Sequence, residues 1–161
     1  MTLKKPFTAA VLALLVSVAP AAYAADEYNV SVGVTAAGAP LGLHGVDPVA
    51  MIRTGEQVEG TAAHTAVHDD VAYYFATADT KAAFEADPAS FLPQYGGFCT
   101  FGVSVGKKFD GDPNYAAVID GSLYVFLNAE IFEAFQADQE GTLAKAAAQW
   151  PKIQSTPVPE L

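Results

Sequence analysis

One thiol and one imidazole are the side chains of this sequence best suited to chemistry. Cys99, the single cysteine, stands in the run QYGGFCTFG (94–102), where glycines alternate with aromatic residues. His44 begins the turn HGVDP (44–48), which would place its imidazole beside the Asp47 carboxylate. An imidazole oriented by a carboxylate is the arrangement of many metal ligands and general bases. Thiolate and imidazole donors together predict a transition-metal site, with copper as the metal.

Each candidate residue also has a structural interpretation. A free cysteine is usually buried and inert, and the aromatic neighbours of Cys99 favour burial, while a redox-active thiol is a third alternative. Asp47 precedes Pro48, and an acidic residue before proline is typical of a helix N-cap. Met51 offers a soft thioether ligand, although its apolar neighbours favour a place in the core.

Other sites are less well supported. His64 and His68 are four residues apart, but their surroundings predict a strand, in which four residues span about 13 Å. The two rings therefore cannot share one ion. The sequence contains no HExxH or CxxCH motif and no dinucleotide fingerprint. An enzyme with Cys99 as nucleophile and His44 as base is consequently the least supported function.

Charge and the N-terminal segment indicate the compartment and exclude some partners. The 161 residues include 18 acidic and 8 basic ones, with a formal net charge of −10, which argues against a nucleic-acid partner. Residues 1–24 are expected to be a removable signal peptide, with Lys4 and Lys5 before an apolar stretch and an AYA cleavage site (22–24). No later stretch is long and apolar enough to cross a membrane. The sequence therefore predicts a soluble, periplasmic protein.

Two segments of the chain resemble each other when one is shifted by 51 positions. Each has two short strands, a turn and a helix: strands 63–67 and 71–76 with a helix to 87, then strands 116–119 and 123–127 with a helix to 137. Matching positions hold the same residue type, as in Asp69, Tyr73, Phe75 and Phe84 against Asp120, Tyr124, Phe126 and Phe135. We interpret them as two copies of one unit that share a core, although common core periodicity also explains the likeness.

These elements predict a single small α+β domain over residues 25–153. The two units pack together, and a C-terminal helix over 142–149 ends before Pro151. Residues 28–34 are expected to form a strand, and residues 154–161 a flexible tail. The segment 93–113, between the units, is expected to be a functional loop because loops on a rigid scaffold often carry function.

Five segments between residues 44 and 153 carry a family resemblance: GVDPVA (45–50), AYYFAT (72–77), FEADP (84–88), QYGGFC (94–99) and AQWP (148–151). They resemble the YHS-domain family in its exported, stand-alone bacterial type. The resemblance implies a small α+β module related to metal-associated domains of heavy-metal transport ATPases, without a settled activity. Metal-handling members carry thiols where this sequence has Ala50, Ala76 and Thr80, so their thiolate site is absent here.

The sequence thus favours a periplasmic, non-catalytic metal-binding module, with copper as the expected ion. Its candidate ligands are Cys99, His44, Asp47 and Met51. The alternative is a structural or interaction protein whose glycine–aromatic loop docks an unidentified periplasmic protein, with Cys99 merely packed.

Overall fold

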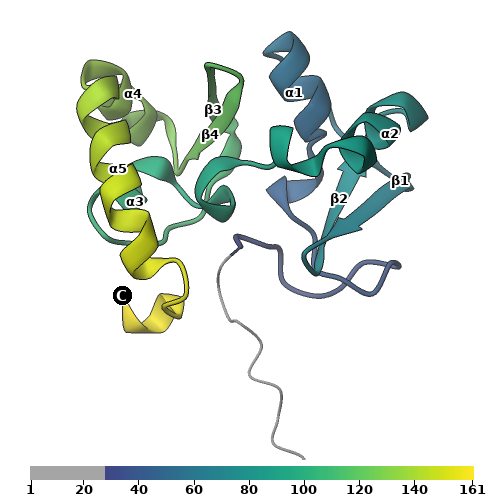
Figure 1. The fold of residues 1–161 in the computed structure, drawn as a ribbon, viewed down its shortest axis with the longest axis horizontal. Helices are drawn as coiled ribbons and strands as arrows, with labels where there is room; N and C mark the ends of the chain where they lie inside the picture. Colours follow the sequence, from purple (N-terminus) through teal and green to yellow (C-terminus); the bar gives the residue numbers. More distant parts are fainter. Residues whose placement is uncertain (1–27) are drawn as a thin grey trace, which may run out of the picture.

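The computed structural model describes residues 28–161, so the expected signal peptide lies outside the described residues. Two antiparallel two-stranded sheets, each with its own helices, form two lobes side by side, and a long helix at the C-terminus covers one of them (Figure 1). The first unit has α1 (Pro48–Thr54), β1 (Thr61–His68), β2 (Val71–Phe75) and α2 (Ala78–Ala86). The second has α3 (Thr100–Ser104), β3 (Asp112–Ile119), β4 (Ser122–Phe126) and α4 (Ala129–Ala137), followed by α5 (Gln139–Ile153). The predicted α+β class is confirmed.

The two hairpins have the same strand register. Ala66 lies opposite Tyr73 in the first sheet, and Ala117 lies opposite Tyr124 in the second, 51 positions later in both strands. Each ladder also shifts register at the matching place, between residues 61 and 65 and between residues 112 and 116. The repeat inferred from the sequence is therefore a structural repeat.

The repeat extends upstream of the hairpins, into the segment expected to be a loop. Three consecutive residues with positive φ occur at 43–45, with values of 48°, 50° and 88°, and again at 95–97, with values of 54°, 63° and 81°. A short 3₁₀ helix coincides with each turn (η1, Leu43–Gly45, and η3, Gln94–Gly97). The helix α1 follows the first turn, and α3 follows the second. The segment 93–113 is thus a second copy of the segment that precedes β1.

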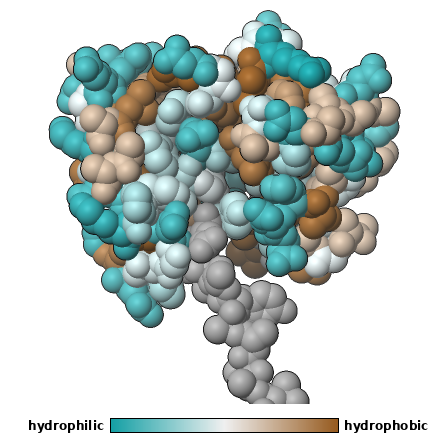
Figure 2. Space-filling view, viewed as in Figure 1, coloured by the Kyte–Doolittle hydropathy of each residue, from teal (hydrophilic) through white to brown (hydrophobic). Residues whose placement is uncertain are grey.

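The predicted shared core lies between the units. Met51 of α1 packs with residues of η1 and β4, and each unit also has its own cluster around the helix that follows its hairpin. The central cluster consists of Leu43, Val46, Met51, Leu123 and Val125. On the face drawn in Figure 2, hydrophobic residues lie in small groups among hydrophilic ones. None of the helices in residues 28–161 is long and apolar enough to span a bilayer.

Two elements differ from their predictions. The expected strand at 28–34 forms only one isolated bridge, from Val30 to Gly42, because Gly33 has φ of 97° and leaves the extended conformation. The C-terminal helix continues through Pro151 to Ile153. Proline removes one helical hydrogen bond, but Ile153 is buried against α3, Phe98 and Ala146, and this packing favours continuation.

The C-terminal tail, expected to be flexible, contacts the second unit. The Lys108 ammonium, which is buried, donates to the carbonyl oxygens of Gln154 (2.8 Å) and Thr156 (2.9 Å). It also lies over the rings of Phe98 and Trp150, at 5.3 and 5.7 Å from their centroids. These contacts hold the start of the tail against α5.

Candidate functional site

Cys99 is the N-cap of α3 and is 1% exposed. Its Sγ accepts a hydrogen bond from the Gly102 N–H at 3.5 Å, and the side chain packs against Phe126 and Phe135. Burial raises the pKa of the Cys99 thiol, although hydrogen bonds from the backbone of Gly102, Leu127 and Phe101 act in the opposite direction. The thiol is therefore a packed group in this structure.

Asp47 is the N-cap of α1 and is fully buried. One carboxylate oxygen accepts from the N–H groups of Val49 and Ala50, both at 2.9 Å. The other accepts from the N–H of Ala76, just after β2, also at 2.9 Å. Both oxygens are thus engaged by the backbone, and Asp47 ties α1 to the end of the first hairpin.

Cys99 and Asp47 hold equivalent places in the two units. Each caps the short helix that follows the positive-φ turn, and each accepts from backbone two and three residues ahead. Each also accepts a hydrogen bond from the backbone of the residue that directly follows the second strand of its unit. These residues are Ala76 and Leu127, which are 51 positions apart. The Cys99 sulfur in one unit therefore caps its helix in the same way as the Asp47 carboxylate in the other.

This equivalence predicts that aspartate can replace Cys99. We expect Cys99→Ala to lower the free energy of unfolding by about 2 kcal/mol, because it removes the cap and leaves a small cavity. Cys99→Asp should recover at least half of that loss at pH 7, because three backbone groups already point at the position. Urea denaturation of both variants measures the difference. An aspartate variant less stable than the alanine variant would contradict the equivalence.

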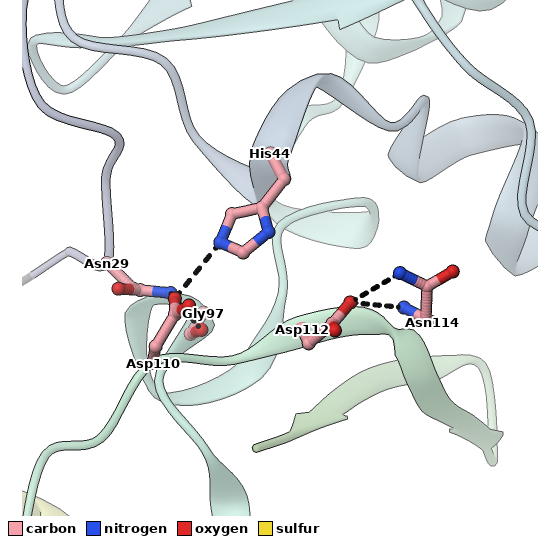
Figure 3. A network of polar contacts seen from close by, with 6 residues as sticks. All are labelled: Asn29, His44, Gly97, Asp110, Asp112 and Asn114. Atoms are coloured by element: carbon pink, nitrogen blue, oxygen red, sulfur yellow. Dashed lines mark hydrogen bonds and ion pairs between the residues drawn. The ribbon is translucent and has the colours of Figure 1, made fainter. Parts of the chain in front are cut away.

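His44 pairs with Asp110 and not with Asp47. The His44 Nε2 lies 3.0 Å from the Asp110 Oδ1, which also accepts from the Asn29 Nδ2 at 2.7 Å (Figure 3). Asn29 in turn donates to the Gly97 carbonyl oxygen at 3.2 Å. The network joins the N-terminal segment, the positive-φ turn of each unit and the segment before β3. The Asp110 carboxylate orients the His44 imidazole, the role that the sequence predicted for Asp47.

Asp110 carries a negative charge at neutral pH. Partial burial acts to raise its pKa, but the Asn29 and His44 hydrogen bonds, the His44 charge and the Gly111 backbone outweigh this and hold the pKa below its usual value. Because the folded-state pKa is the lower one, the stabilisation is present above the unfolded-state pKa and is lost as pH falls through the folded-state value.

Acid denaturation tests this linkage. We expect the difference in unfolding free energy between the wild type and Asp110→Asn to be largest above about pH 5 and to shrink below about pH 4. Asp79→Asn, at an exposed position in α2, is the matched control and should show a smaller change over the same range. The measurement is guanidinium denaturation at a series of pH values. A difference between wild type and Asp110→Asn that grows toward acid pH would contradict the assignment.

Met51 lies in the central core, as its apolar neighbours in the sequence indicated. It also lines a shallow pocket of about 120 Å³, together with Gln57 and Asn114. This position suits packing between the units better than coordination of an ion.

The four predicted ligands do not form one site. Within residues 28–161, no hydrogen bond joins Cys99 to His44, and no group of three or more histidine, cysteine, aspartate and glutamate side chains could hold a metal ion. Cys99 and His44 nevertheless contact two consecutive residues. The Cys99 N–H donates to the Phe109 carbonyl oxygen at 3.0 Å, and His44 pairs with Asp110. Sequence spacing could not reveal Asp110 as the partner, since it lies 66 positions from His44.

Large apolar side chains are exposed around α3. Phe109 is 47% exposed, Leu127 is 36% exposed, and Val105 at the end of α3 is exposed as well. We call these three residues the α3 patch. The first unit has smaller side chains at the places equivalent to Phe109 and Leu127, namely Val58 and Ala76, and both are only partly exposed. The fold itself therefore does not require large exposed apolar residues at these positions.

Comparison of the chain with protein-family models, with curated proteins and with solved structures found no match. The likeness to the YHS-domain family stays a prediction from the sequence.

Proposed function

We propose that the chain is an exported, non-catalytic interaction module that docks a periplasmic protein through the α3 patch. The observation that carries the proposal is the difference in exposure between two side chains of the segment 93–113. Its thiol is 1% exposed, whereas its Phe109 is 47% exposed. Export is inferred from the signal-peptide pattern of residues 1–24.

Exposing apolar side chains to water costs free energy. A large apolar side chain left in water forgoes about 1.5–3 kcal/mol of burial free energy. Clustered exposed apolar residues on a protein surface often mark an interaction site. All three residues of the α3 patch lie at α3: the Phe109 ring packs on Gly102, Val105 is the C-cap, and the Leu127 backbone is hydrogen-bonded to the N-cap Cys99. The residues of the first unit equivalent to Phe109 and Leu127 are smaller and only partly exposed.

Site-specific photo-crosslinking in the native compartment tests the proposal. A benzophenone amino acid at position 109 should give discrete crosslinked adducts. The matched control is the same amino acid at Val67, which is 49% exposed and lies on β1 of the other unit. Adducts of equal yield at both positions, or at neither, would remove support for the α3 patch as the docking surface.

A second candidate function, binding of a transition-metal ion, is favoured by the orientation of His44. Its imidazole is exposed and held by a carboxylate, the arrangement typical of a metal-ligating histidine. Copper(II) is the expected ion because it binds nitrogen and oxygen donors most tightly among the first-row divalent metals. In this version of the site, Cys99 and Met51 contribute packing and not ligation.

Calorimetric titration with copper(II) measures this second function. If it is correct, the wild type binds one ion, His44→Ala weakens binding at least about tenfold, and Cys99→Ser leaves it unchanged. His64→Ala is the matched control for loss of an imidazole and should also leave binding unchanged. Equal affinity of the wild type and His44→Ala would eliminate this site.

A further inference from the structure

We propose that the partner of the α3 patch is a protein segment that combines basic and apolar side chains and lies across Phe109 and Asp110. The inference rests on the docking function proposed above and adds the chemistry of the partner to it.

The apolar half of the surface is held firmly by the backbone beneath it. A β-carbon at Gly102 would lie only 2.8 Å from the Phe109 Cδ2, so the ring packs directly on the α3 backbone while nearly half of the residue stays exposed. Leu127 follows β4, and its backbone is hydrogen-bonded to the cap residue Cys99. Both side chains therefore project from ordered backbone, which reduces the entropy cost of binding.

A fixed negative charge lies next to the ring. Asp110 directly follows Phe109, its side chain is 55% exposed, and hydrogen bonds from Asn29 and His44 hold its orientation. These contacts use Oδ1 while the carboxylate stays accessible to solvent. A basic side chain placed above Asp110 would meet a carboxylate that is already oriented, and an apolar neighbour of that side chain would meet Phe109.

Overall charge argues against the other occupants. The chain has 18 acidic and 8 basic residues, so a second copy would approach with the same net charge of −10. Nucleic acids and anionic lipid surfaces are also negatively charged and are repelled for the same reason. A basic protein segment is attracted by the whole molecule before it contacts the patch. Within the segment 93–113 of this chain, Lys107 is exposed and would repel a basic partner, which makes it a useful test position.

A displayed library of random dodecapeptides is the probe, selected on the wild-type protein at low salt. Enriched sequences are then synthesised and their affinity measured by fluorescence anisotropy. The variants are Phe109→Ser, Leu127→Ser, Asp110→Asn and Lys107→Ala, with Val67→Ser as the matched apolar control. Circular dichroism confirms that each variant is folded. Two variants within the patch keep the test valid if one of them fails to fold.

We expect enriched peptides to contain basic and apolar residues. Their affinity should fall at least about tenfold in Phe109→Ser and Leu127→Ser, stay unchanged in Val67→Ser, and rise in Lys107→Ala. It should also fall about fivefold between 50 and 300 mM NaCl and fall in Asp110→Asn.

Peptides that depend on Phe109 but carry no basic residues, and that bind equally at both salt concentrations, would overturn this inference and leave the docking function intact. Enrichment that is the same on wild type and Phe109→Ser would overturn both. The two failures are therefore distinguishable.

Discussion

Replacing Asp47 with alanine is expected to lower the free energy of unfolding by about 4 kcal/mol, a large part of the stability of a small domain. The carboxylate is fully buried and accepts from three backbone N–H groups, two in α1 and one after β2. Alanine removes the N-cap, worth about 1 kcal/mol, and leaves two buried donors and one partly buried donor without an acceptor, each costing about 1–3 kcal/mol before relaxation. Thermal and urea denaturation measure the loss.

Two further variants show whether this loss comes from the three hydrogen bonds. Asp47→Asn keeps one acceptor oxygen, so its stability should lie between those of the wild type and the alanine variant. Asp79→Ala removes an exposed acidic residue from the first turn of α2 and should cost less than about 1 kcal/mol. If Asp47→Ala were no more destabilising than Asp79→Ala, the structural role of Asp47 would be wrong.

Gly111→Ala is the second substitution with a large expected effect, about 3 kcal/mol of unfolding free energy. A β-carbon at this position would overlap the Gly97 carbonyl oxygen and the Val125 Cγ2. Neither atom can move easily, because Gly97 belongs to the positive-φ turn and Val125 to the buried strand β4. The substitution would also displace the adjacent Asp110 and with it the His44 pair.

The control for Gly111 is a glycine in open space. Nothing lies within 4 Å of a β-carbon at Gly106, but its φ of 76° strains any other residue, so Gly106→Ala should cost about 1 kcal/mol. Chemical denaturation of the two variants compares a clash with backbone strain. A Gly111 variant as stable as the Gly106 variant would show that the Gly97–Gly111 approach is not tight.

The hairpin part of the repeat could be predicted from the sequence because its buried positions keep their residue types. Tyr73 and Tyr124, or Phe84 and Phe135, occupy the same core positions in the two units, and core packing restricts what can replace them. Periodicity and turn residues then indicated the strands and helices.

The upstream part of the repeat could not be predicted because its two copies use different side chains for the same task. A buried carboxylate at Asp47 and a buried thiol at Cys99 both cap a short helix, and no residue scale treats these two groups as alike. What the copies share is three consecutive positive φ values, a backbone property that only their glycines signal in the sequence.

The candidate site was predicted only in part, for the same physical reason. The sequence identified His44 and the segment around Cys99, and it gave the structural alternatives for Asp47 and Met51 that their burial supports. It could not identify Asp110 and Asn29, because their contacts with each other and with His44 arise from packing of distant segments. Side-chain exposure, which separates Phe109 from Cys99, is likewise a property of the tertiary fold.

The central claim is that the segment 93–113 acts through its outer apolar surface and not through its thiol. The most direct measurement places the photo-crosslinking amino acid at Leu127 and compares adduct yield in the wild type, Phe109→Ser and Cys99→Ser. We predict that the adduct is lost in Phe109→Ser and kept in Cys99→Ser. An adduct that survives loss of the aromatic ring but disappears with the sulfur would contradict the account.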